Sequence, residues 1–151
     1  MVILGVDPGT TRMGYGVIQK DKNSLRCVDY GLISGSSSKK ELIGELNQLI
    51  AAYRPDVAAV EKLFFFKNQK TIMAVSEMRG IVLAGLALAD IPVYEYTPLE
   101  VKQSVSNYGR AGKDQVQKMV RLILNLKTKI RPDDAADGLA IAICCANTII
   151  R

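Results

Sequence analysis

Apolar positions along the chain fall into two patterns. Short runs rich in Val and Ile, bounded by Gly, Pro or Asp, are typical of strands, and apolar residues three or four positions apart are typical of helices with one buried face. The first pattern predicts strands at residues 2–6, 13–19, 25–33, 56–60 and 92–96. The second predicts helices at residues 39–53, 68–89, 98–106, 112–126 and 132–149.

The order of these elements predicts the fold class. The first three strands are joined by short turns, as in an antiparallel meander, and the next two alternate with helices, which favours parallel strands. The expected fold is α/β, with a mixed five-stranded sheet (three antiparallel meander strands plus two parallel strands) flanked by helices on both faces. This is the order of the ribonuclease-H-like fold. The sequence shows no internal repeat and no linker, so we expect a single domain over residues 1–151.

Four acidic residues stand out by their positions. Asp7 ends the first strand and Glu61 ends the fourth, so both carboxylates emerge at one sheet edge if these strands are parallel neighbours. Asp134 and Asp137 are three positions apart in the last helix and share one of its faces. Three of them have an ordinary alternative explanation: a turn at Asp7, a solvated strand end at Glu61, and a helix start favoured by the dipole at Asp134. Asp137, a full turn further into the helix, is harder to explain in this way. Their joint placement on this topology favours a catalytic site.

Composition narrows the chemistry of such a site. The chain has no histidine, which excludes a Ser-His-Asp triad, imidazole acid–base catalysis and a His-ligated zinc site. Clustered carboxylates repel one another unless a cation lies between them, and oxygen-only ligands favour Mg²⁺ or Mn²⁺. Two such ions suit in-line attack on a phosphodiester. We therefore expect two Mg²⁺ ions per active site, with Mn²⁺ as a substitute, held by the four acids.

The net charge of +5 is concentrated in one part of the chain. Residues 101–131 include eight basic residues and one acidic residue, so this stretch carries +7 and the remainder is slightly acidic. Such a local excess is typical of a surface that binds the phosphate backbone of DNA, although solvated lysine faces on two helices are the alternative. The candidates for DNA contact are Lys102, Arg110, Lys113 and Lys118. Lys113 begins a helix, where backbone N–H groups could help it hold a phosphate.

The connection after Glu61 is aromatic. All three Phe residues of the chain lie at 64–66, between Lys62 and Lys67. One of them could insert between bases, or the run could form a hydrophobic lid on the next helix. That helix, at 68–89, has few charges and is either a central core helix or part of a dimer interface.

Other features of the sequence predict the location of the protein. Cys144 and Cys145 lie inside an apolar run and are expected to be buried thiols in a reducing cytosol. The first apolar run stops at Asp7, too soon for a signal peptide, and the longest apolar stretch, Ile81–Ala89, is too short to cross a bilayer. We therefore expect a cytoplasmic protein with no membrane partner.

Several motifs around the acids and the basic residues occur together. They are Ile3-Leu4-Gly5-Val6-Asp7-Pro8-Gly9, Val60-Glu61 with Phe64 and Asn68, Arg79-Gly80, Val101-Lys102-Gln103, Lys113 with Gln115-Val116-Gln117 and Met119-Val120, and Asp134-Ala135-Ala136-Asp137 with Leu139-Ala140-Ile141-Ala142. Through them the chain resembles, over its whole length, the RuvC-type Holliday-junction resolvases. These are crossover junction endodeoxyribonucleases of the ribonuclease-H-like superfamily.

The resemblance implies a homodimeric, Mg²⁺-dependent endonuclease of DNA recombination and repair. Such an enzyme binds a four-way junction and makes paired symmetric nicks in two strands of like polarity. The four acids match the family's metal-binding catalytic acids. Phe64 matches the aromatic residue that contacts opened bases, and Lys102 and Lys113 match basic residues near the scissile phosphate. In bacteria such enzymes act with the RuvA–RuvB branch-migration complex, which is therefore a candidate partner.

Three alternatives stay open from the sequence alone. Gly5-Val6-Asp7-Pro8-Gly9-Thr10-Thr11 also resembles the first phosphate loop of actin-like ATPases and sugar kinases, of which this chain would be a phosphotransferase fragment. A related ribonuclease-H-like nuclease could act on another substrate, such as an RNA–DNA hybrid. A catalytically silent junction-binding protein is the third alternative, and the presence of all four acids argues against it.

Overall fold

The strands form one sheet with β1 at its centre. The computed structural model describes residues 1–33, 38–63 and 69–149. Its strands are β1 (Val2–Asp7), β2 (Met13–Lys20), β3 (Leu25–Ile33), β4 (Val57–Glu61) and β5 (Val93–Tyr96). They follow the order β3-β2-β1-β4-β5, with antiparallel β1–β2 and β2–β3 pairs and parallel β1–β4 and β4–β5 pairs. The predicted mixed sheet with its antiparallel meander is confirmed.

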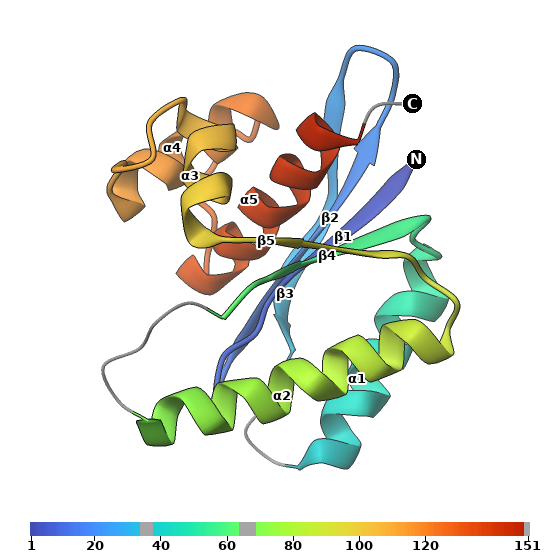
Figure 1. The fold of residues 1–151 in the computed structure, drawn as a ribbon. Coiled ribbons are helices and arrows are strands. Elements are labelled where there is room, and N and C mark those ends of the chain that lie inside the picture. The colour runs from blue at the N-terminus through green and yellow to red at the C-terminus, as the bar shows by residue number, and fades with distance from the viewer. Residues whose placement is uncertain (34–37, 64–68, 150–151) are drawn as a thin grey trace.

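Helices cover both faces of the sheet, as predicted (Figure 1). One face carries α1 (Lys39–Tyr53) and α2 (Gln69–Leu88), and the other carries α3 (Pro98–Ser106), α4 (Lys113–Ile123) and α5 (Asp133–Thr148). The prediction that α4 extends to residue 126 was wrong. The helix ends at Ile123, and Asn125 has a φ of 52°, a left-handed conformation that a helix cannot continue.

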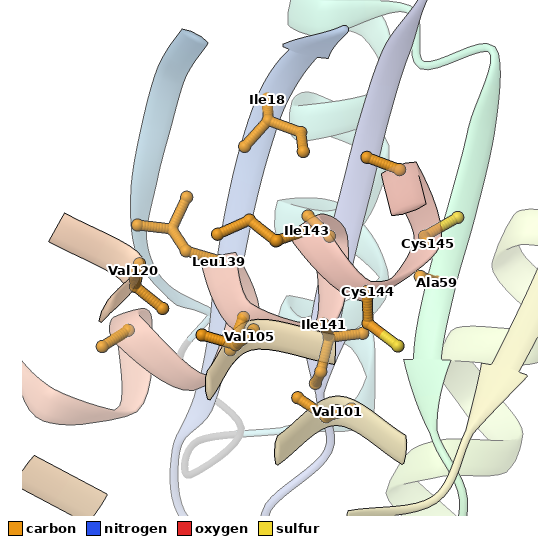
Figure 2. Close-up of a cluster of buried hydrophobic side chains, with 14 of the residues drawn as sticks. Ile18, Ala59, Val101, Val105, Val120, Leu139, Ile141, Ile143, Cys144 and Cys145 are labelled. Carbon is orange, nitrogen blue, oxygen red and sulfur yellow. The ribbon is translucent and has the colours of Figure 1, made fainter. Parts of the chain in front are cut away.

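The sheet divides the hydrophobic core into two clusters. The cluster on the α5 side is built around Leu139, Ile141 and Ile143 of α5, with Val101 and Val105 of α3 (Figure 2). Cys144 and Cys145 belong to the same cluster and are buried, as expected. Burial raises the pKa of each of these thiols to about 11, so both are protonated at neutral pH. The second cluster lies between the sheet and the two helices α1 and α2.

Strand alternation decides which face the two strand-end acids occupy. Ile3 of β1 and Ala59 of β4 belong to the cluster on the α5 side. Side chains two positions apart lie on the same face of a strand. Asp7 and Glu61 are separated from these two residues by even numbers of positions. Both acids therefore lie on the face that α5 covers.

Glycines let α5 approach the sheet backbone very closely. A Cβ added at Gly14 of β2 would lie 1.7 Å from the carbonyl oxygen of Asp134, and one at Gly16 would lie 2.6 Å from the backbone nitrogen of Leu139. On the helix itself, a Cβ at Gly138 would lie 2.5 Å from the carbonyl carbon of Tyr15. No side chain fits in these gaps, so the glycines fix how close α5 lies to the strands.

The helix α2 is unusually apolar. Within the described ranges, Lys70–Leu88 is long and apolar enough to cross a membrane by length and composition, with a mean hydropathy of 1.5. Core helices of globular proteins meet the same criterion. Val82 and Leu86 of α2 are fully buried in the second cluster, and its Glu77 and Arg79 form ion pairs within the protein. We therefore interpret α2 as a helix packed on the sheet.

Candidate active site

A cavity of about 250 Å³ opens at the carboxyl ends of β1 and β4. Its polar lining consists of Asp7, Glu61 and Asp137 with two lysines, Lys102 and Lys113. The remaining lining side chains are Pro98, Val101, Val116, Ala140 and Ile141. Predicted acids and basic residues from five separate elements thus meet around one cavity.

The strand register explains why two acids meet here. β1 and β4 are parallel neighbours, with Val6 opposite Val60, so the next residue of each strand is one of the acids. Asp7 and Glu61 therefore emerge side by side at the same edge and on the same face. Their carboxyl groups are linked by a hydrogen bond, which adds to the rise in the pKa of Asp7 and partly offsets the rise in the pKa of Glu61. Such a bond requires a proton on one of the two groups.

The two acids of α5 occupy different positions relative to the cavity. Asp137 lines it, whereas Asp134 is not among its lining residues. Asp134 lies one helical turn earlier, where its backbone packs against Gly14. Its charge still contributes to the raised pKa of Asp7, so it belongs to the same electrostatic cluster. The structure therefore brings three acids into contact with the cavity and places the fourth beside it.

Crowding of like charges raises the pKa values of these carboxyls. Burial is the largest cause for Asp7, followed by the charges of Glu61 and Asp137, and its pKa rises to about 8. Burial and the charge of Asp137 also raise the pKa of Glu61. The pKa of Asp137 is raised by burial, although Lys113 partly offsets the effect. Buried carboxyls with raised pKa values are poised to bind a cation or to hold a proton.

Lys113 faces the acids from the first turn of α4. Its Nζ lies 3.3 Å from Oδ2 of Asp137. Burial alone would lower the pKa of Lys113, but the charges of Asp137 and the neighbouring acids Asp134 and Asp133 outweigh it and raise the pKa. The ammonium group is therefore held in its charged form at the mouth of the cavity.

The donor set fits a hard divalent cation. Every candidate ligand is a carboxylate, and the nearest cations supplied by the protein are two lysines. Buried carboxylates with this little compensation are stabilised when a metal ion lies between them. In the part of the chain that the structure describes, however, no group of three or more Asp, Glu or Cys side chains is arranged so that it could hold a metal ion. The oxygens therefore match such an ion in chemistry and location but do not form a finished coordination shell.

The other predicted DNA-contact residues lie outside the cavity. Lys118 is exposed on α4, and Arg110 is exposed in the loop between α3 and α4. Arg110 lines a separate shallow depression together with Tyr108 and Gln103. Phe64 lies outside the described residues. Of the four predicted basic contacts, Lys102 and Lys113 line the cavity, and the other two lie on the surrounding surface.

One residue near the site had no role predicted for it from the sequence. Arg79 of α2 donates a hydrogen bond from Nε to the backbone oxygen of Glu61, at 3.0 Å, and pairs with Glu95 of β5. The available signal was an Arg in a helix with few charged residues. Its partners could not be identified from the sequence because they lie on two other elements.

Comparison with known proteins matches the chain to one family of nucleases. The family model described as "Crossover junction endodeoxyribonuclease RuvC" matches residues 3–145. The chain is 49% identical to the crossover junction endodeoxyribonuclease RuvC of Petrotoga mobilis, over 97% of this chain and 94% of that protein. It is 51% identical to the RuvC of Chloroflexus aggregans, over 98% of this chain and 94% of that protein.

A solved structure shows the same architecture. It is the T. thermophilus RuvC in complex with Holliday junction substrate, and it matches with a TM-score of 0.85 at 36% identity. The match covers 95% of this chain and 92% of that one. The likeness therefore extends over nearly the whole fold.

Proposed function

The chain belongs to the RuvC family of crossover junction endodeoxyribonucleases, and we propose that the cavity at the ends of β1 and β4 is its site of phosphodiester hydrolysis. The family's activity is the resolution of Holliday junctions in DNA recombination and repair, and this is the function of the chain. The observation that carries the proposal is the convergence of Asp7, Glu61 and Asp137 on one cavity, with raised pKa values and a facing lysine. The phosphotransferase and silent-binder alternatives are not favoured.

The four acids supply the ligands for catalysis. Asp7, Glu61 and Asp137 would hold two Mg²⁺ ions, or Mn²⁺, with Asp134 completing the set from the preceding turn of α5. Bound ions of this kind activate water for in-line attack and stabilise the leaving oxygen. The proton on Asp7 must leave before that carboxylate can act as a ligand.

The lysines act on the scissile phosphate. Lys113 lies beside Asp137, whose charge keeps the ammonium group of Lys113 charged and directed at the acids. Lys102 lines the cavity, and its charge favours ionised Glu61. Both can offset negative charge that develops on the phosphate in the transition state.

The surrounding surface would hold the junction. Arg110 and Lys118 extend the positive charge away from the cavity and would contact the phosphate backbone. Phe64, which follows Glu61 closely in sequence, would contact opened bases.

Paired symmetric nicks require two equivalent sites, which a twofold homodimer provides. The apolar face of α2 is a candidate interface, since Met73 and Leu88 are 73% and 88% exposed. We also propose that the enzyme acts in the cytoplasm and works with the RuvA–RuvB complex.

Cleavage of defined DNA substrates tests the proposal. A labelled four-way junction and a linear duplex of the same sequence are incubated with the protein in Mg²⁺ and in EDTA. We expect paired nicks in the junction, in Mg²⁺ only. Equal cutting of both substrates, or cutting that survives EDTA, would contradict the proposal.

A further inference from the structure

Arg79 contacts the sheet from the face opposite the cavity. It lies in the middle of α2, and only 17% of its side chain is exposed. Its guanidinium makes two contacts, one to the backbone oxygen of Glu61 at the end of β4 and one to the carboxylate of Glu95 on β5. Arg79 thus connects α2 to two strands immediately behind the proposed active site.

The end of β4 needs such support. β1 pairs with β4 only as far as Val60, so the β1–β4 register stops before Glu61. On the other side, Glu61 pairs with Tyr96 of β5, and the backbone N–H of Lys62 donates to the oxygen of Tyr96 at 2.7 Å. The backbone of Glu61 is therefore held by β5 and by Arg79.

We propose that Arg79 is a positioning residue for Glu61. By fixing the carbonyl of Glu61 from behind and binding Glu95, it sets the direction in which the Glu61 carboxylate enters the cavity. This rests on the proposed function of the cavity as a metal-dependent nuclease site. Groups that orient metal ligands typically change metal affinity or activity by about 10- to 100-fold when they are removed.

An arginine suits this task better than a lysine. The planar guanidinium can donate from Nε to one acceptor and from a terminal nitrogen to another in a fixed relative geometry. A lysine at the same position can pair with Glu95 but cannot hold both acceptors in one plane. Arg79→Lys should therefore keep the α2–β5 ion pair and hold the carbonyl of Glu61 less firmly.

The test compares Arg79→Gln, Arg79→Lys and Glu95→Gln with a matched control, Lys39→Gln. Lys39 forms another ion pair with α2, through Glu77, and does not line the cavity. Mn²⁺ binding to the metal-free protein is measured by calorimetry, and nicking and junction binding are measured separately.

For Arg79→Gln we expect Mn²⁺ affinity to fall about 10-fold or more. Its nicking should recover at high Mn²⁺, and its junction binding should not change. Arg79→Lys and Glu95→Gln should show smaller losses, and Lys39→Gln none.

Amide hydrogen exchange at Lys62 gives a readout that does not depend on metal or activity. Loss of Arg79 should loosen the strand end and speed exchange of this amide about 10-fold, whereas Lys39→Gln should not. Unchanged exchange in Arg79→Gln, or an equal change in Lys39→Gln, would overturn the proposal. If Arg79→Gln does not fold, the same comparison between Glu95→Gln and Lys39→Gln decides it. A wild-type protein that fails to nick junctions would contradict the proposed function, and the exchange result would still decide the role of Arg79.

Discussion

The two faces of the sheet are packed in different ways. On the α5 face, the helix backbone meets the strand backbone at Gly14, Gly16 and Gly138, with no space for a side chain. On the other face, α1 and α2 pack through side chains such as Leu42 and Leu86. Gly85 of α2 faces a side chain rather than backbone, since a Cβ there would lie 2.7 Å from Cδ2 of Leu46, and Gly44 of α1 is exposed with open space beside it. The α5 face therefore adds backbone contact to its side-chain packing, whereas the described residues of the other face pack through side chains.

This difference matches what each face has to do. The α5 face carries acids whose separation must be constant if they are to share metal ions, and backbone contact leaves little freedom to change it. The α2 face carries exposed apolar side chains, and packing through side chains adapts more readily to a partner chain. The predictions below test this contrast in order of decreasing effect.

The largest effect should come from an acid on the α5 face. Asp7→Asn removes a proposed metal ligand and should lower the nicking rate about a thousandfold or more. Catalytic groups that act together lose most of their combined effect when one of them is removed. Junction binding should persist because the basic surface is untouched. The matched control is Glu41→Gln, an exposed acid of α1 on the other face, which should nick at the wild-type rate. A fully active Asp7→Asn variant would show that this carboxylate is not needed for catalysis and would contradict the proposed role of the acids.

The next effect concerns the glycines. Gly14→Ala places a methyl group against the carbonyl of Asp134 and should cost about 1–3 kcal/mol or more of unfolding free energy, with loss of nicking. Gly44→Ala, within α1, should stabilise the protein by about 0.5–1 kcal/mol. Urea denaturation measures both. Similar effects of the two substitutions would mean that Gly14 does not pack closely against the backbone of α5.

A third prediction concerns pH. The pKa of Asp7 rises from 3.8 to about 8, so between these values the folded protein keeps a proton that the unfolded chain releases. The unfolding free energy of the metal-free protein should therefore fall as pH rises through this window. The unfolding free energy of Asp7→Asn should fall less steeply with pH. The difference from the wild type then isolates the contribution of Asp7 from that of the other titrating residues. Chemical denaturation in EDTA from pH 5 to 8 measures the difference, and parallel curves would show that Asp7 does not hold the proton.

The smallest effect should come from the outer basic surface. Lys118→Ala should weaken junction binding and reduce the slope of log affinity against log salt by about 0.9, the value for one phosphate contact. Lys40→Ala, on the first turn of α1, should leave the slope unchanged. Fluorescence anisotropy over a salt series gives both slopes. Equal slopes for Lys118→Ala and the wild type would place Lys118 outside the DNA contact surface.

The features that were predicted depend on short stretches of sequence. Asp7 and Glu61 were found because each follows a buried strand, and Asp137 because of its spacing from Asp134 along a helix. Features that depend on contacts between distant elements were not predicted. The partners of Arg79 lie on β4 and β5, and the contact of Gly14 with α5 joins residues far apart in the chain. Asp134 was expected to lie with the other acids. Its charge does raise the pKa of Asp7, but its side chain is not among those that line the cavity.

Thermal unfolding at pH 8 tests most directly whether the acids form a cation site. Without metal, Asp7→Asn should be more stable than the wild type because it removes one of the crowded carboxyls. Added Mg²⁺ should raise the Tm of the wild type by about 2–4 °C per kcal/mol of binding free energy, and should have little effect on Asp7→Asn. A wild-type protein that is the more stable of the two in EDTA and does not respond to Mg²⁺ would contradict this account.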